Sequence, residues 1–316
     1  MDAAPTDHPD RQPDNPQATP TTAAIIVTYN PEGKAVDLIR SCLAQGCHVI
    51  VIDNNSTPGK TLGEISSTPG IHFEKMSENL GLARAQNAGV MISKASGCQR
   101  TIFFDQDTSV PDGFIADMNR AFDELRKTEP SLALLGPNYF DRNTGDDAHY
   151  AKLTPRGYKT VSLADRAEEV SFIISSGSIV ETSLFDKTGP FMDKFFIDQI
   201  DTEFCLRLAK NRLKIYATPA AKIIHTIGDR QKHKIMFLTI KPNHHSATRK
   251  FYSVRNGLKT MAMYGKDFPG FIILMTLRLI HDVMGIVFFE ERKLDKLKAM
   301  WKGMMESMKP MDRWRN

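Results

Sequence analysis

The amino-acid sequence predicts an α/β fold, in which a doubly wound, mixed sheet is followed by a helical C-terminal region. Two observations lead to this prediction. Short apolar runs alternate with helical patterns through the first half of the chain, and the end of the chain is helical by pattern. The chain has 316 residues, of which 41% are hydrophobic and 25% charged, so it can bury a core of ordinary size.

The first half shows the alternation most regularly. An apolar run starts at Ala23 and stops at the turn residues 30–33, which is typical of a buried strand of a parallel sheet. Residues 34–45 then carry apolar side chains at helical spacing. The same patterns predict strands at 48–52, 71–76 and 101–104 and an Ala-rich helix at 80–94.

The second half is less regular. It predicts strands at 131–139, at 169–181 with an interruption at 175–178, at 214–217 and at 222–225, a helix at 201–211, and helices in the last ~65 residues. Residues 1–21 combine five prolines with polar side chains, so they cannot bury enough apolar surface to offset the entropy of ordering, and we expect disorder there.

Charge and cysteine content exclude some classes of protein. The net charge is +4, but residues 292–316 alone carry +5, so the basic character belongs to the tail and a nucleic-acid-binding domain is not predicted. The four cysteines form no CxxC pair, and no signal-peptide pattern opens the chain. We therefore expect a cytoplasmic protein with free thiols, either in solution or at the inner face of the cell membrane.

Polar clusters follow three of the predicted strands, at 28–30, 53–55 and 105–107. Ligands bind at the carboxyl ends of strands in such sheets, which locates a candidate site. Asp105 and Asp107 lie two apart and point the same way in an extended segment, as ligands for Mg²⁺ or Mn²⁺ do. Asp53 either accepts a hydrogen bond from a pyrimidine ring or only closes an Asx-turn, and both remain open.

Four successive segments together carry a family resemblance. They are Ile26–Asn30, Val51–Ser56, Glu78–Ala83 and Phe104–Asp107, and in this order they resemble the signatures of family 2 glycosyltransferases with the GT-A fold. The resemblance covers roughly residues 23–230. The segments 196–207, 225–229 and 251–256 are similar to the bacterial rhamnosyltransferase branch. The expected organisation is a disordered segment (1–21), a Rossmann-like GT-A domain (22–245) and a C-terminal helical region with a basic amphipathic tail (246–316).

The resemblance implies a dTDP-L-rhamnose donor and a polysaccharide or lipid-linked glycan acceptor. It implies that Asp201 is the catalytic base and that Asp105, Asp107 and His225 bind Mg²⁺ or Mn²⁺. The implied donor-binding residues are Thr28, Tyr29, Asn30, Asp53, Asn79, Gly81, Arg84, Asp105 and Gln106, and those on the acceptor side are Ser176, Gly177 and Asp198.

A general base at Asp201 predicts a single displacement, in which the acceptor hydroxyl attacks opposite the leaving dTDP and the anomeric configuration inverts. Asp198 competes for the role, because it lies three residues earlier and would share a face with Asp201 if the segment were helical. Asp201 is favoured because the family pattern continues directly from it. Its structural alternative is a helix N-cap.

The tail leaves two interpretations open. Residues 268–289 are apolar but interrupted by Arg278, His281 and Asp282, so we expect no membrane-spanning helix. Beyond them, Leu294, Leu297, Trp301, Met304 and Met308 repeat at 3-4 spacing beside several lysines, and Trp314 follows. This pattern is typical of an interfacial membrane helix, or of a seam that packs on the domain or on a second subunit.

Three other functions compete with rhamnosyl transfer. A family 2 transferase that uses another donor, such as a UDP-hexose, would show the same site. A non-catalytic sugar-nucleotide-binding protein would be expected to lack the metal or base carboxylates, yet Asp105, Asp107 and Asp201 are all present. A nucleotidyltransferase is disfavoured, because residues 30–34 are a poor match to a phosphate-binding loop.

Overall fold

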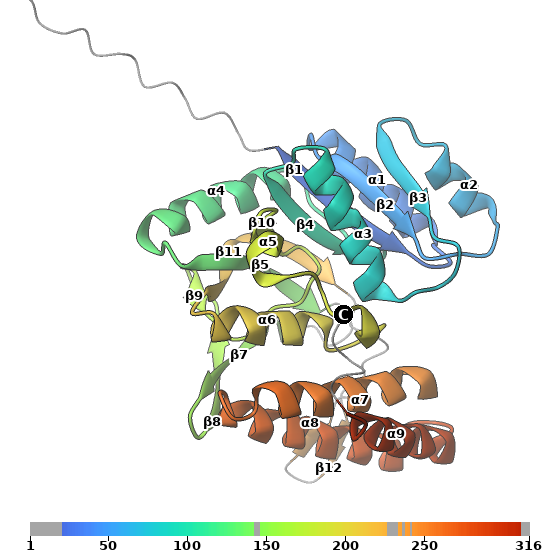
Figure 1. Ribbon diagram of the computed structural model, residues 1–316, viewed down its shortest axis with the longest axis vertical. Helices are drawn as coiled ribbons and strands as arrows, with labels where there is room; N and C mark the ends of the chain where they lie inside the picture. The colour runs from blue at the N-terminus through green and yellow to red at the C-terminus, as the bar shows by residue number, and fades with distance from the viewer. Residues whose placement is uncertain (1–20, 142–145, 226–232, 236–237, 241, 311–316) are drawn as a thin grey trace, which may run out of the picture.

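The structure is a computed structural model that describes residues 21–141, 146–225, 233–235, 238–240 and 242–310 (Figure 1). Of the segment predicted to be disordered, all but Thr21 lies outside the described residues. The described chain forms one large mixed sheet, helices on both of its faces, and a layer of three C-terminal helices at one end (Figure 1).

The central sheet has the strand order β3-β2-β1-β4-β10-β5-β11-β9, with β6 beside β5. Strands β10 and β9 run antiparallel to their neighbours, as does β6, and the others are parallel. The bounds are β1 (Thr22–Thr28), β2 (His48–Asp53), β3 (Ile71–Lys75), β4 (Arg100–Asp105), β5 (Leu132–Asp141), β6 (Asp146–Asp147), β9 (Glu168–Glu169), β10 (Ile179–Glu181) and β11 (Lys214–His225). The predicted doubly wound, mixed sheet is confirmed.

Both faces of the sheet are buried, which explains why its strands are continuous apolar runs. On one face Ile25, Ile50 and Phe103 pack against α3 (Leu82–Ala95) and α6 (Ile200–Lys210). On the other face Ile26, Val51 and Phe104 pack against α1 (Gly33–Ala44) and α4 (Phe114–Thr128). Neighbouring residues of a strand thus serve opposite cores, as the two-residue period of a strand requires.

Several elements differ from the sequence prediction. The prediction of one strand at 169–181 is wrong, because only the two ends of this segment form strands, β9 at its start and β10 at its end. The two strands predicted at 214–217 and 222–225 are one strand, β11, whose register shift between Thr218 and Lys222 accommodates Pro219. The prediction also missed α2 (Lys60–Ser66), α4, α5 (Leu184–Thr188), η1 (Asp193–Phe195) and the hairpins β7–β8 (His149–Thr154, Gly157–Ser162) and β12–β13 (His233–Ile235, Leu238–Ile240).

The C-terminal helices are α7 (Ala247–Tyr264), α8 (Pro269–Phe288) and α9 (Lys293–Ser307). Figure 1 shows them as a layer below α6. The Glu290 carboxylate, which follows α8, links the three helices to one another. It lies 3.2 Å from the Lys250 ammonium of α7 and accepts a hydrogen bond from Lys296 of α9 at 2.8 Å. The Tyr264 hydroxyl donates to Glu203 at 2.6 Å and so ties α7 to α6. These contacts fix the layer against the sheet domain.

Helix α8 alters the interpretation of the apolar segment near 268–289. It is a continuous 20-residue helix with a mean hydropathy of 1.9 over its best window, so it is long and apolar enough to cross a membrane by length and composition. Arg278, His281 and Asp282 interrupt the apolar sequence but do not end the helix, and the expectation that it spans no membrane stays a prediction. They line a cavity on one of its sides.

The 3-4 stripe of α9 is divided between two environments. Leu297 and Met304 pack toward Val254 and Ile286 of the neighbouring helices. Leu294, Trp301 and Met308 are 72%, 61% and 74% exposed. The predicted single apolar face is therefore half a packing seam and half an exposed strip, and Trp314 lies outside the described residues.

Candidate active site

Polar residues from three parallel strands meet in a cleft of about 510 Å³ at the carboxyl edge of the sheet. The parallel register places Thr28 beside Asp53 and Val27 beside Asp105, so the ends of β1, β2 and β4 are level. The predicted residues that line the cleft are Tyr29, Asn30, Asn79, Gly81, Asp105, Gln106 and Asp107. Thr28, Asp53 and Arg84 are not among them.

The Asp53 side chain is wholly buried under the cleft. It accepts a hydrogen bond from the Thr28 hydroxyl at 3.0 Å and one from the Ser56 amide at 2.9 Å, and the Ser56 hydroxyl also bonds to it. The next residue, Asn54, reaches the cleft and accepts from the Leu80 amide at 2.9 Å. Asp53 thus holds the floor of the cleft in place, and its direct contact with a nucleotide base stays a prediction.

Two loop contacts shape the rim. The Tyr29 amide donates to the Gln106 side-chain oxygen at 2.8 Å, and the Gln106 amide nitrogen donates back to the Tyr29 carbonyl at 3.2 Å. The Asn30 amide donates to Ser56 at 2.8 Å. This reciprocal pairing ties the loop after β1 to the loop after β4, so the two loops present one continuous surface.

The opposite wall requires a glycine at position 81. Gly81 has φ = +89°, and a Cβ there would lie 2.6 Å from the Cα and carbonyl oxygen of Phe196. The Leu82 amide donates to that carbonyl at 2.5 Å. The start of α3 and the segment around Phe196 therefore close the cleft by direct backbone contact. Arg84, further along α3, is exposed and does not line the cleft.

Asp105 and Asp107 supply two carboxylates to the cleft, a donor set that fits Mg²⁺ or Mn²⁺ when a diphosphate and water complete the coordination. Among the described residues no group of three His, Cys, Asp or Glu side chains forms a ready-made metal centre. His225 ends β11, but its side chain lies outside the described part, so its predicted role as a third ligand is untested.

Ser176 and Gly177 lie beneath the end of β4. The Ser176 hydroxyl accepts from the Asp105 amide at 3.2 Å and lies 2.6 Å from the Thr108 hydroxyl, and it is fully buried. Gly177 (φ = +79°) donates its amide to the Phe103 carbonyl at 2.7 Å. Both residues support the Asp105 segment, and their predicted place on the acceptor side is untested.

Asp201 lies in a second cavity, of about 790 Å³, which extends from α6 to the β7–β8 hairpin and α8. It is the second residue of α6, and Asp198 lies in the loop before that helix, so the two do not share a helical face. Burial and the nearby carboxylates of Asp198 and Asp105 raise the pKa of Asp201 to about 6, although the Thr202 amide and Arg278 act in the opposite direction.

Asp198 is paired with a residue that the sequence reasoning missed. The Arg249 guanidinium of α7 donates from Nε to both carboxylate oxygens at 3.1 Å and from Nη2 to one of them at 2.9 Å. Arg249 lines both the cleft and the cavity, so it lies where the two meet. No local pattern indicates this, because the two partners are 51 residues apart.

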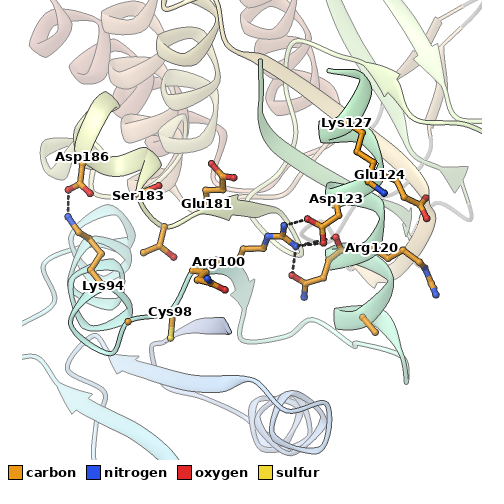
Figure 2. Close-up of a pocket in the computed structure, with 15 residues that line it drawn as sticks. Lys94, Cys98, Arg100, Arg120, Asp123, Glu124, Lys127, Glu181, Ser183 and Asp186 are labelled. Carbon is orange, nitrogen blue, oxygen red and sulfur yellow. Dashed lines mark hydrogen bonds and ion pairs between the residues drawn. The ribbon is translucent and has the colours of Figure 1, made fainter. Parts of the chain in front are cut away.

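A third cavity lies elsewhere in the described part of the chain. It has about 1030 Å³ and lies around the start of β4, at the edge of the sheet opposite the cleft (Figure 2). Several of its charged groups are paired: Arg100 bonds to Asn119 at 2.8 Å and to Asp123 at 3.2 Å, and Lys94 bonds to Asp186 (Figure 2). This cavity lies away from the carboxyl ends of β1, β2 and β4, where ligands bind in such sheets, so the smaller cleft is the better candidate for chemistry.

Comparisons with known proteins agree with this geometry. The profile described as glycosyl transferase family 2 matches residues 23–189. A protein named dTDP-rhamnosyl transferase RfbF, from Shigella flexneri, is 31% identical over 284 residues, covering 87% of this chain and 91% of its own length.

Two solved structures share the fold. One of GalNAc-T7 with UDP, GalNAc and Mn²⁺ aligns with a TM-score of 0.56 at 13% identity, over 78% of this chain and 48% of that chain. One of TarS from S. aureus aligns with a TM-score of 0.51 at 14% identity, over 90% of this chain and 43% of that chain. This chain thus spans less than half the length of either.

The mixed, doubly wound sheet with a carboxylate-bearing cleft at its strand ends is the GT-A fold, and the profile match and the relative identify the chain as a glycosyltransferase. More narrowly, the chain belongs to glycosyl transferase family 2.

The raised pKa of Asp201 predicts a pH dependence for sugar transfer. A general base must be ionised, and a carboxyl with a pKa of about 6 is protonated below that pH. We expect kcat/KM to fall roughly tenfold per pH unit below pH 6 and to level off above it. A profile measured from pH 4.5 to 8 that stays flat throughout would contradict the role of Asp201.

Proposed function

We propose that this protein transfers L-rhamnose from dTDP-β-L-rhamnose to a hydroxyl group of a cell-surface polysaccharide or lipid-linked glycan. The observation that carries the proposal is the likeness to a named dTDP-rhamnosyl transferase over 87% of this chain. A donor in the cleft and an acceptor in the cavity would meet beside Arg249.

Asp105 and Asp107 would hold Mg²⁺ or Mn²⁺ against the donor diphosphate. The metal supplies positive charge that offsets the negative charge on the departing dTDP. Tyr29, Asn30 and Asn79 contact the nucleoside from the rim of the cleft, and Gln106 keeps the rim closed. Asp201 removes the proton from the attacking hydroxyl, which its burial beside two other carboxylates prepares it to do near neutral pH.

Donor hydrolysis tests the proposal without knowledge of the acceptor, because water can replace the acceptor hydroxyl. Across a panel of nucleotide sugars with Mg²⁺ or Mn²⁺, we expect dTDP release from dTDP-L-rhamnose and its loss on chelation with EDTA. Preference for a UDP-hexose would overturn the donor assignment. Failure of dTDP to bind in a calorimetric titration would overturn sugar-nucleotide binding altogether.

The same assay tests the base. Asp201→Asn keeps the size of the side chain but cannot take a proton, so we expect release to fall roughly 10²-fold or more with dTDP affinity unchanged. Asp186→Asn, at an exposed ion pair with Lys94, is the matched control and is expected to retain full activity. Turnover in Asp201→Asn equal to that of the unmodified protein would exclude Asp201 as the base.

We further propose that α8 and α9 dock the protein on an anionic lipid surface. Helix α8 exposes apolar side chains along one side, from Ile273 through Leu277 and Ile280 to Val287. Helix α9 exposes Leu294, Trp301, Met305 and Met308 next to exposed Lys293, Lys298 and Lys302. Exposed apolar groups flanked by lysines match a negatively charged membrane interface, where each lysine contributes about 1 kcal/mol.

Vesicle sedimentation tests this docking. We expect binding to vesicles that contain phosphatidylglycerol, weaker binding to pure phosphatidylcholine, and a loss on the order of 30-fold in Lys298→Ala/Lys302→Ala. Leu294→Ala/Trp301→Ala should also reduce binding, whereas Met91→Ala, which removes an equally exposed apolar side chain on α3, should not. A stable dimer that Leu294→Ala/Trp301→Ala dissociates, with no vesicle binding, would show that the strip joins two copies instead.

A further inference from the structure

The four residues 196–199, termed here the 196–199 loop, have an unusual backbone. Phe196, Asp198 and Gln199 have φ of +57°, +64° and +64°, a region that residues with a Cβ seldom occupy. Such conformations persist only where the surrounding structure over-determines them, and they cluster at functional sites. Phe196 and Ile197 line the donor cleft, and Asp198 and Gln199 line the Asp201 cavity, so the loop is the wall between the two.

Asn256 of α7 binds the inner side of this loop. The Asn256 side chain is fully buried, and its Nδ2 donates to the carbonyl oxygens of Phe195, Ile197 and Asp198 at 2.7, 2.9 and 2.9 Å. The amide is held in this orientation because Arg255 Nε donates to Asn256 Oδ1 at 2.9 Å. The two N–H groups of one side chain are thus shared among three backbone carbonyls, of which that of Phe195 also accepts from the Ile197 amide.

Arg249, about two turns earlier on α7, binds the same loop through its side chain. Its guanidinium forks onto the Asp198 carboxylate, and the Asp198 side chain is only 17% exposed while that of Arg249 is 42% exposed. A forked pair fixes the direction of the carboxylate as well as its distance. From α7 a third contact is aromatic: the Tyr252 ring stacks on Phe196 with centroids 4.9 Å apart and planes at 16°.

The loop leads directly into the residue that the proposed mechanism uses as its base. Helix α6 begins at Ile200, and Asp201 follows, so any rotation of the loop displaces the Asp201 carboxylate relative to the donor cleft. On its other side the loop carbonyl of Phe196 receives the Leu82 amide of α3. The loop is therefore held between α3 of the sheet domain and α7 of the C-terminal layer.

We infer that Arg249 and Asn256 are positioning residues, which hold the 196–199 loop in its left-handed conformation and so set the place of Asp201 between the donor cleft and the acceptor cavity. The inference rests on the proposed role of Asp201 as base. Helix α7 therefore contributes to the active site, although this helix lies outside the sheet domain.

Asn256→Asp is the sharpest test, because it keeps the size of the side chain but puts an oxygen in place of the two N–H donors that face three carbonyls. We expect kcat for dTDP release to fall roughly tenfold to a hundredfold with KM for the donor and dTDP affinity unchanged, since misplacement of a reacting group by about 1 Å has effects of this size. Asn211→Asp, whose Nδ2 donates to a single exposed carbonyl at 2.8 Å, is the matched control and should keep full turnover.

Arg249 variants can be followed by the pH dependence of kcat, whose acid limb would not move if the variants only lost packing. The charged and titratable groups that act on Asp201 or line its cavity from these elements are Asp198 in the loop, Asp105 on β4, Arg249 and Lys250 on α7, and Arg278, His281 and Asp282 on α8. Arg249→Lys keeps the positive charge and loses the fork, so kcat should fall while the acid limb of the pH profile stays in place. Arg249→Met leaves Asp198 unpaired beside Asp201, so the acid limb should move to higher pH. Arg40→Lys, at an exposed ion pair with Glu64, is the control for the exchange.

Two results would overturn the inference. Asn256→Asp with unchanged kcat, in a preparation where Asp201→Asn is inactive, would show that the base is effective without this support. Equal losses of kcat, dTDP affinity and melting temperature in Asn256→Asp and Arg249→Lys would show that α7 only stabilises the fold. If Asp201→Asn is itself fully active, the proposed base is wrong, and that outcome is distinct from both.

Discussion

Parallel pairing of β1 with both β2 and β4 is the constraint on which the rest of the site depends. This register brings Thr28 level with Asp53 and Val27 level with Asp105, so polar residues that are far apart in the sequence share one edge of the sheet. Helices on both faces exclude water from the strands, and only the strand ends remain available to a ligand. The donor cleft follows from the topology before any particular side chain is considered.

The second cavity, which contains Asp201, is built differently. The Asp201 cavity is bounded by α6, the β7–β8 hairpin and α8, and these elements come from outside the regular βα succession. Helix α8 contributes Arg278 and His281 to the cavity and an exposed apolar side to the surface. Helix α8 thus carries part of the proposed membrane-docking surface and also lines the cavity that holds Asp201 of α6, which connects the two proposals physically.

The parts of the fold that sequence reasoning predicted are those determined by local pattern. Buried strands such as β1 and β2 are continuous apolar runs, and Asp105 and Asp107 stand out because they follow such a run directly. Helix α4 was missed although Phe114, Met118 and Phe122 repeat at helical spacing. The pattern around Pro219 predicted two separate strands, but a bulge accommodates this proline within the single strand β11.

Most of what was missed at the site depends on tertiary contacts. The pairing of Arg249 with Asp198 and of Asn256 with the 196–199 loop joins residues more than 50 positions apart. The family pattern included Arg255 and Asn256, but a pattern indicates that a residue matters and not which backbone carbonyls it binds. Likewise Ser176 and Gly177 were placed by resemblance on the acceptor side, whereas their described contacts support the strand end that carries Asp105.

The proposed mechanism is a single displacement, with the donor bound in the cleft on one side of the 196–199 loop and Asp201 as the base on the other. The anomeric configuration of the product tests this most directly. With dTDP-β-L-rhamnose as donor and methanol as a surrogate acceptor, NMR of the methyl rhamnoside reports the configuration through the coupling at the anomeric carbon. A single displacement yields the α-L-rhamnoside. Formation of the β-L-rhamnoside, or a rhamnosyl group trapped covalently on the protein, would contradict it.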